Sequence, residues 1–256
     1  MLANLLVMSR TRRWLSREIA LVGCRVEGKV AFITGGASGF GRQSAIRLSE
    51  QGAQVVITDI DEAGARDSAE LIAGESLVCR LDVVDDCQWQ TAMDQTLALF
   101  GHIDIVMNSA GIAAQIDDIE HITDETWNQV LDINLTGTFL GCQHAVRVMR
   151  DHRGGSIINL SSVLGIRGDA DSLAYSASKG GVRLLTKSVA AHCGEQRLGI
   201  RCNSIHPGYM RTPMVQTWFD SMEDSNEVEQ RLLAHHPIGR LGDADDIAQM
   251  VVYLAS

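Results

Sequence analysis

The chain alternates short apolar runs with longer segments in which apolar residues recur every three or four positions. The short runs are bounded by glycine or polar residues and are apolar nearly throughout, which is typical of strands buried on both faces of a sheet. Their positions predict strands at 29–34, 54–59, 103–108, 156–160 and 200–205. The longer segments have the period of amphipathic helices.

Helices are expected between these strands, over 39–51, 61–73 and 123–149, with a further one opening after Asp85. Asp85 with Gln88 three residues later has the form of a capping box. Alternation of strands and helices predicts parallel pairing with right-handed crossovers, and therefore helices on both faces of the sheet. The expected fold class is α/β, a Rossmann-like doubly wound parallel sheet.

Length and composition favour one domain. The chain has 256 residues, 45% of them hydrophobic, and its 3 prolines mark no linker. We expect a single domain over 25–256, preceded by a leader over 1–24 that carries four arginines among apolar residues. This leader has the composition of an organellar transit peptide, or it is an unstructured extension. We expect a cytoplasmic protein, or one in the mitochondrial matrix if the leader is a transit peptide.

The charge balance narrows the choice of partners. With 22 basic and 32 acidic side chains, the formal net charge of -10 would repel nucleic-acid phosphates. No stretch is long and apolar enough to span a bilayer, so we expect neither nucleic-acid nor membrane partners. The six cysteines form no CxxC pair and no metal-ligand spacing, which indicates reduced thiols and no metal site.

A glycine-rich turn, residues 34–41, follows the first strand and enters the first helix. Glycine lets the backbone approach a pyrophosphate, and the amino terminus of a helix offers unpaired N–H groups and a positive dipole. The turn therefore predicts a dinucleotide site, although a tight turn without a ligand is the simpler alternative. The residues expected at the cofactor are Gly35, Ser38, Gly39, Phe40 and Gly41.

Asp59 ends the second strand, where an acidic side chain can accept hydrogen bonds from the adenosine ribose. Its carboxylate would repel a 2′-phosphate, so we expect NAD rather than NADP. Arg42 is the nearby cation that argues the other way. A strand-end aspartate that only caps a turn is the alternative.

Tyr175 and Lys179 lie one helical turn apart, and Ser162 precedes them at the end of an apolar strand. Residues four apart share one face of a helix. A lysine cation, helped by an oxidised nicotinamide, would favour the phenolate and lower the tyrosine pKa from about 10. Because ligands of open α/β sheets bind at the carboxyl ends of strands, this group predicts a dehydrogenase site. A pair on a solvated helix face is the alternative.

Taken in order, these motifs resemble the short-chain dehydrogenase/reductase family, in its NAD-preferring branch near the alcohol and hydroxysteroid dehydrogenases. The resemblance runs from Gly28 onward. It implies that Ser162 binds the substrate oxygen, that Tyr175 exchanges the alcohol proton, and that Lys179 lowers the tyrosine pKa and binds the nicotinamide ribose. Asn134 would complete the catalytic set by holding a water in a proton relay toward the lysine.

The resemblance also implies further cofactor contacts, in addition to those of Tyr175 and Lys179. They are Asp82 and Val83 at the adenine, Asn108, Ala110 and Gly111 beside the adenosine ribose, and Pro207, Gly208 and Thr212 at the nicotinamide carboxamide. Ser109 stands where the family usually has asparagine, for which we expect a cost in stability. Thr212 before Pro213 is also an ordinary helix start.

The family normally continues beyond Ser256 into a glycine-containing loop and a last strand, so we expect that strand to be missing. We expect a homodimer through the helices near Asn134 and Tyr175, with a homotetramer as the alternative. The leading function is NAD-dependent interconversion of a secondary alcohol, cyclic or hydroxysteroid-like, and a ketone. The alternatives are a 3-oxoacyl reductase that uses NADPH and a cofactor-binding protein without turnover.

Overall fold

The computed structural model describes residues 24–113, 118–213, 215–216, 230, 232–234 and 236–256. The leader expected over 1–24 lies outside the described residues except for its last position. The cytoplasmic location and its mitochondrial alternative therefore stay predictions.

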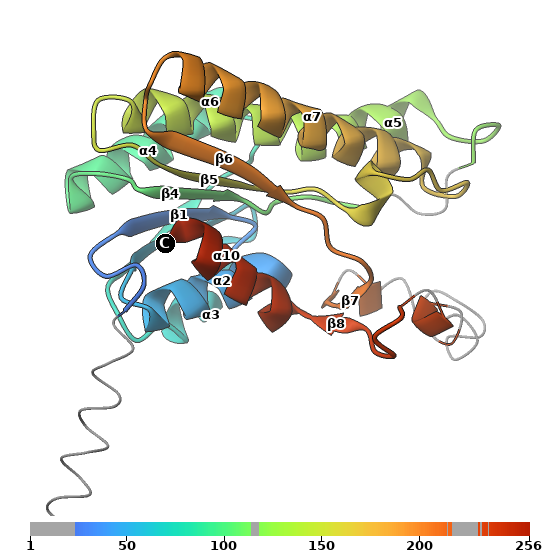
Figure 1. Ribbon diagram of the computed structural model, residues 1–256, viewed down its shortest axis with the longest axis horizontal. Helices are drawn as coiled ribbons and strands as arrows, with labels where there is room; N and C mark the ends of the chain where they lie inside the picture. The colour runs from blue at the N-terminus through green and yellow to red at the C-terminus, as the bar shows by residue number, and fades with distance from the viewer. Residues whose placement is uncertain (1–23, 114–117, 214, 217–229, 231, 235) are drawn as a thin grey trace, which may run out of the picture.

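Six parallel strands form one sheet in the order β3-β2-β1-β4-β5-β6 (Figure 1). Their bounds are β1 (Val30–Thr34), β2 (Gln54–Asp59), β3 (Ser76–Arg80), β4 (Ile105–Asn108), β5 (Gly155–Leu160) and β6 (Ile200–Ile205). The order reverses between β1 and β4, which is the switch point of a doubly wound sheet. The predicted fold class is confirmed, and within the described residues the sheet ends at β6.

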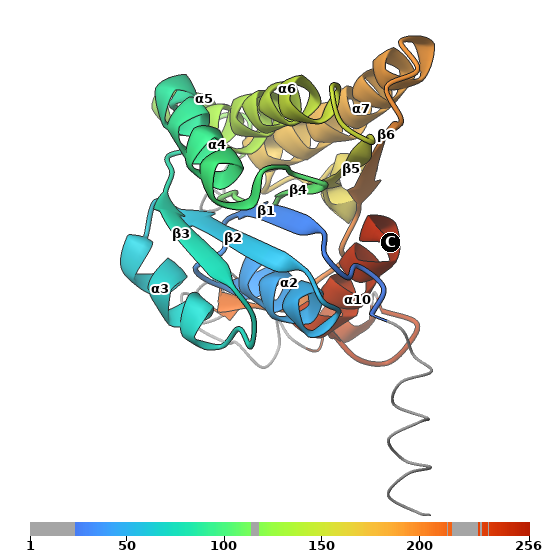
Figure 2. The same cartoon turned by 90° about the vertical axis from the view of Figure 1, so that its left-hand side faces the viewer.

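Helices cover both faces of the sheet (Figures 1 and 2). One face carries α2 (Gly39–Glu50), α3 (Glu62–Glu70) and α10 (Ala244–Ala255), and the other carries α4 (Asp86–Phe100), α5 (Asp124–Leu131), α6 (Gly137–Met149) and α7 (Leu173–Glu195). No helix among the described residues combines the length and the apolar character that a membrane span requires.

Strand β1 belongs to two hydrophobic cores. Val30 and Phe32 pack toward α4 and α6, whereas Ala31 and Ile33 pack toward α2 and α10. All four side chains are fully buried. The continuous apolar pattern of this strand is therefore explained by helices on both faces.

Helix α4 begins at the predicted cap. The Asp85 carboxylate accepts hydrogen bonds from the backbone N–H groups of Cys87 and Gln88, at 2.9 and 3.1 Å. The Gln88 amide, however, donates to the Asp85 carboxylate rather than to the backbone of Asp85, so the reciprocal bond of a capping box is not made.

The helix expected over 123–149 is interrupted in the middle. A π-helical turn, η1 (Asp132–Thr136), separates α5 from α6. It holds Asn134 fully buried. Such bulges occur mostly at functional sites, because the extra residue turns one side chain out of the regular helical spacing. Here the turn directs Asn134 to the loop after β4 and to α7.

Beyond the carboxyl end of the sheet, a two-stranded parallel ribbon joins β7 (Met210–Arg211) to β8 (Gly242–Asp243) (Figure 1). The ribbon follows β6 by four residues and leads into α10, which opens with a complete capping box of Asp243 and Asp246. The backbone after β6 is thereby fixed beside the active-site end of the sheet.

Candidate active site

A pocket of about 320 Å³ lies at the carboxyl ends of the strands, beside the switch point. Open α/β sheets bind their ligands at this place. Ten predicted cofactor residues line it: Gly35, Ser38, Gly39, Phe40, Asp59, Asp82, Val83, Ala110, Gly111 and Thr212. Five segments that are distant in the sequence thus converge on one cleft.

The lining also contains apolar residues that the motifs did not identify: Ile60, Leu81, Ile112, Ile133 and Pro213. All five adjoin a predicted residue in the chain, so proximity to a motif was the available signal. Ile133 precedes Asn134 in the π-helical turn, which brings it to the cleft.

The glycine turn offers room for an anion. Gly35 has a φ of 67°, and a Cβ there would lie 2.8 Å from the backbone of Ala110, so the loops after β1 and β4 touch. A Cβ at Gly39 would meet open space, and the N-cap residue Ser38 makes no side-chain capping bond. The first turn of α2 is therefore free of a side-chain cap, which fits a pyrophosphate.

Six of the expected cofactor residues do not line the cleft: Gly41, Asn108, Tyr175, Lys179, Pro207 and Gly208. A Cβ at Gly41 would lie 2.1 Å from the Gly35 carbonyl oxygen, so this glycine lets α2 pack under the turn. The buried Asn108 Nδ2 donates to Asn159 Oδ1 at 2.8 Å and joins β4 to β5 inside the core. Gly41 and Asn108 therefore contribute to the packing around the cleft without lining it.

Asp59 is fixed at the edge of the cleft. Its two carboxylate oxygens accept hydrogen bonds from the backbone N–H groups of Ala37 and Asp61, each at 3.0 Å. Arg42 lies beside it but is held by neutral oxygens, with bonds to Ser68 Oγ at 2.8 Å and to the carbonyls of Gly64 and Ala37. The carboxylate is thus presented to the cleft while the guanidinium is anchored.

The proton-transfer residues meet between β5 and α7. Ser162 follows β5 and opens a 3-10 turn, η2 (Val163–Gly165), in which its Oγ accepts the N–H of Leu164 at 3.1 Å. The Ser162 side chain also lies beside the Tyr175 phenol and acts to lower its pKa. Because one lone pair of Oγ is engaged by Leu164, the hydroxyl hydrogen can be donated to an oxygen in the site.

Lys179 lies on the same face of α7 as Tyr175, as predicted, with its Nζ 5.5 Å from the centre of the tyrosine ring. It is buried, and Nζ donates to the Leu160 carbonyl at 2.9 Å. Burial disfavours the charged form and lowers the pKa of Lys179 to about 8. One ammonium hydrogen is thus fixed at the end of β5.

The tyrosine does not show the lowered pKa that we expected. Burial raises the pKa of Tyr175, the Ser162 side chain opposes this, and nearby Tyr209 adds to the increase. The lysine ammonium does not offset the loss of solvent, because it is itself desolvated. The phenol is therefore protonated at neutral pH.

Asn134 joins three parts of the site. Its Oδ1 accepts the N–H of Ile112 at 2.8 Å, and its Nδ2 donates to the Ile112 carbonyl at 2.9 Å and to Ser178 Oγ at 3.1 Å. A Cβ at Gly111 would lie 3.0 Å from Asn134 Oδ1 and 3.4 Å from Lys179 Nζ. Asparagine and lysine thus face the same backbone segment, and the water relay stays a prediction.

Replacing Asn134 with alanine should lower the free energy of unfolding by about 1–3 kcal/mol, because the backbone groups of Ile112 lose their partners. Urea denaturation measures this loss. Asn128→Ala, at an exposed position of α5, is the matched control and should change stability by less than about 0.5 kcal/mol. Equal stability of the two variants would show that the buried bonds contribute nothing.

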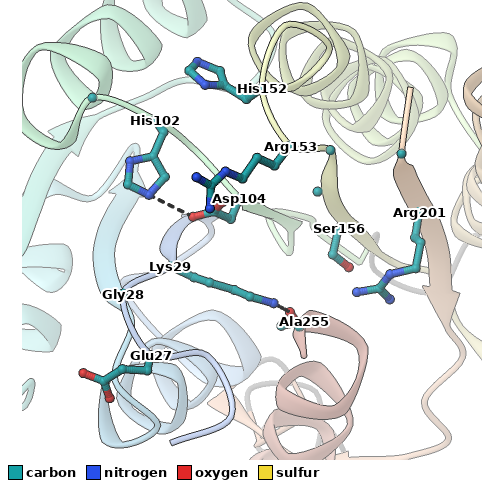
Figure 3. A pocket seen from close by; sticks show the side chains of 14 residues that line it. Glu27, Gly28, Lys29, His102, Asp104, His152, Arg153, Ser156, Arg201 and Ala255 are labelled. Atoms are coloured by element: carbon teal, nitrogen blue, oxygen red, sulfur yellow. Dashed lines mark hydrogen bonds and ion pairs between the residues drawn. The ribbon is translucent and has the colours of Figure 1, made fainter. Parts of the chain in front are cut away.

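A wider pocket, of about 770 Å³, lies at the opposite, amino-terminal ends of the strands (Figure 3). Its lining contains none of the predicted site residues. Lys29 donates to the carbonyl of Ala255 at 2.6 Å, and Arg201 donates to two further carbonyls at the end of α10. His102 contacts Asp104 at 3.1 Å. These charges hold the end of α10, so we place the chemistry at the smaller cleft.

The sequence and the fold of this chain are similar to those of known proteins. A family model described as enoyl-(acyl carrier protein) reductase matches residues 35–256. The solved structure of levodione reductase superposes with a TM-score of 0.87 and 35% identity, covering 90% of this chain and 91% of that one.

The chain belongs to the short-chain dehydrogenase/reductase family.

Curated members of this family cover most of the chain. An NADP-dependent (R)-specific alcohol dehydrogenase of Lentilactobacillus kefiri is 39% identical over 236 residues, 91% of each chain. A 3-alpha-(or 20-beta)-hydroxysteroid dehydrogenase of Mycobacterium tuberculosis is 40% identical over 233 residues, 91% of this chain and 84% of that protein. The chain is accordingly an oxidoreductase of CH–OH groups that uses a nicotinamide cofactor.

Proposed function

We propose that this short-chain dehydrogenase/reductase interconverts a secondary alcohol and a ketone with NAD, and that Tyr175 is the proton acceptor and donor. The observation that carries the proposal is the position of Lys179 on the same face of α7 as Tyr175, with its Nζ 5.5 Å from the ring centre, and of the Ser162 side chain beside the phenol. A protein that only binds a cofactor does not need a proton acceptor such as Tyr175 with Ser162 and Lys179 beside it.

Each residue has a defined part in alcohol oxidation. A nicotinamide cofactor bound in the cleft would supply the hydride acceptor for the carbinol carbon. The Ser162 hydroxyl donates a hydrogen bond to the substrate oxygen and holds it beside Tyr175. The Tyr175 phenolate takes the hydroxyl proton as the C=O double bond forms. Lys179, fixed by Leu160, directs its other hydrogens toward the cofactor ribose and favours the phenolate. Ketone reduction reverses both transfers.

Asp59 supports the choice of NAD. Its carboxylate is held by two backbone N–H groups at the edge of the cleft, where the second ribose hydroxyl of the adenosine would lie. The L. kefiri relative is named as NADP-dependent, which favours the opposite choice. Since Arg42 is anchored on neutral oxygens, we take the carboxylate as decisive.

A cyclic alcohol is the proposed substrate class. Relatives are named as cyclohexanol dehydrogenase, hydroxysteroid dehydrogenase and levodione reductase. The test follows the absorbance of NADH across linear and cyclic secondary alcohols, with a 3-oxoacyl thioester and NADPH as the competing pair. NADH formation from cyclic alcohols supports the proposal. Turnover of the thioester alone would favour the 3-oxoacyl reductase, and no turnover at all would favour a binding protein.

The pH dependence should differ between the two directions. Alcohol oxidation needs the phenolate, and burial raises the pKa of Tyr175, so kcat/KM for oxidation should increase with pH above neutrality. Ketone reduction needs the phenol and should be fastest at neutral pH and below. Initial rates in both directions from pH 6 to about pH 10 measure this. An oxidation rate that falls with pH would contradict the role of Tyr175.

We further propose a homodimer through the helices on the Tyr175 side of the sheet. Phe139 on α6 and Leu184 on α7 are 44% and 63% exposed, so this side presents apolar side chains that a second copy would cover. Light scattering measures the mass. A monomer at working concentration would contradict the proposal, and a tetramer would extend it.

A further inference from the structure

His206 follows β6 directly and lies beside the serine of the site. Its Nδ1 is 3.1 Å from the carbonyl oxygen of Ser162, and its Nε2 is 2.9 Å from Ser204 Oγ. The ring is half-buried and spans the gap between the end of β6 and the turn after β5. His206 opens the stretch that the resemblance places at the nicotinamide carboxamide, but its side chain has no assigned role there and does not line the cleft.

The two contacts determine the tautomer of the ring. A carbonyl oxygen can only accept, so the hydrogen must lie on Nδ1 of His206, which donates to Ser162. In the neutral ring Nε2 then carries a lone pair, which accepts the Ser204 hydroxyl. Ser204, His206 and Ser162 therefore form a directed chain of hydrogen bonds that ends at the backbone of the serine.

Neighbouring bonds fix the backbone on both sides of Ser162. The N–H of Ser161 donates to the Ile205 carbonyl at 2.9 Å, and the N–H of Val163 donates to the Pro207 carbonyl at 3.0 Å. The His206 bond lies between these two, on the Ser162 carbonyl, which also accepts the N–H of Gly165 at 2.9 Å. Residues 205–207, at the end of β6, are therefore hydrogen-bonded to residues 161–163, which include Ser162.

We infer that His206 is a positioning residue, which acts through the Ser162 backbone to aim the Ser162 hydroxyl at the substrate oxygen. The inference rests on the proposed role of Ser162. Loss of the ring bond would leave the Ser162 carbonyl with the N–H of Gly165 alone. That bond and the Leu164 partner of the hydroxyl both lie within the turn itself, so the turn and the Ser162 hydroxyl could shift together relative to β6. The step impaired would be turnover rather than cofactor binding.

Three substitutions separate positioning from simple support. His206→Leu removes the donor and keeps the bulk, whereas His206→Asn places an N–H at the position of Nδ1, and His206→Gln places it one bond too far. With saturating cofactor, His206→Leu should lower kcat about fivefold to tenfold, the effect of one lost hydrogen bond. His206→Asn should restore most of kcat and His206→Gln little of it. The Kd for NADH should stay unchanged in all three.

A double-mutant cycle with Ser162→Ala decides whether His206 acts through the serine hydroxyl. In the Ser162→Ala background, His206→Leu should cause no further loss of kcat, because no hydroxyl remains to be aimed. If the kcat losses of the two single variants multiply in the double variant, the inference is wrong. An unchanged kcat in His206→Leu would also overturn it. If Ser162→Ala itself keeps full turnover, both the inference and the proposed role of Ser162 fail.

Ser204→Ala keeps the test valid if His206→Leu does not fold. It leaves the ring in place and removes the hydroxyl that orients Nε2. The expected loss of kcat is smaller, about twofold to threefold, and should vanish when combined with Ser162→Ala. A full kcat in Ser204→Ala would contradict the directed chain of hydrogen bonds.

Discussion

Replacing Tyr175 with phenylalanine is expected to lower kcat by about two to four orders of magnitude, the usual contribution of a general acid or base. The change removes the phenol oxygen and keeps the ring, so the packing of α7 and the cofactor cleft should survive. Binding of NADH, measured by fluorescence titration, should be within a factor of about two of the original.

The chain offers a matched control for this change. Tyr253 lies on α10, 62% exposed and far from the cleft, with Arg25 over its ring. Tyr253→Phe removes the same atom and should leave kcat unaltered. If Tyr175→Phe and Tyr253→Phe both keep full turnover, another group moves the proton and the assignment of roles is wrong.

Replacing Asp59 with serine should shift the ratio of kcat/KM for NAD over NADP toward NADP by about two orders of magnitude. At about 4 Å and an effective dielectric constant near 20, two like charges repel by about 4 kcal/mol, and partial exposure of Asp59 reduces this. Serine keeps an oxygen for the backbone N–H of Ala37. A 2′-phosphate would then meet no carboxylate at this edge of the cleft, while Arg42 stays held by Ser68 and the carbonyls of Gly64 and Ala37.

Asp61→Ser is the control for the loss of charge. Asp61 lies two residues away, caps α3 through the N–H of Gly64 and does not line the cleft. Serine is also a good N-cap, so this variant should fold normally. The ratio of kcat/KM for NAD over NADP should change much less in Asp61→Ser than in Asp59→Ser. A parent enzyme that already prefers NADP would refute the argument from Asp59.

The architecture could be predicted because its causes are local in the sequence. The residues of β1 are apolar throughout since helices cover both faces, and β2 and β6 have the predicted bounds. The glycine turn could be recognised because only glycine tolerates the φ of 67° at Gly35 and the close approach of Gly41 to the carbonyl of Gly35. The spacing of apolar residues and glycines along the chain was therefore sufficient to predict these strands and the turn.

Other features depend on tertiary contacts that spacing does not encode. The pattern over 123–149 is helical on both sides of the π turn, and the extra residue is stabilised by the bonds of Asn134 to Ile112 and Ser178. The burial that raises the pKa of Tyr175 likewise depends on elements distant in the sequence. Edge strand β3 was not delimited, because its side chains are only partly buried and its apolar run is short.

His206 could not be recognised either. A histidine after a strand is usually a satisfied polar residue, and nothing in the spacing links it to Ser162, which lies 44 positions earlier. The connection exists because β5 and β6 are neighbours in register, with Leu160 beside Ile205. The residues that follow the two strands therefore meet at the same edge of the sheet.

Hydride transfer in a single turnover, followed by stopped flow with NAD and a cyclic secondary alcohol, tests the central claim most directly. With the original enzyme, the logarithm of the rate should rise with unit slope in pH until the phenol of Tyr175 is fully ionised, and then level. The Tyr175→Phe variant should be slow and independent of pH throughout this range. A variant that follows the same pH curve at the same rate would contradict the account.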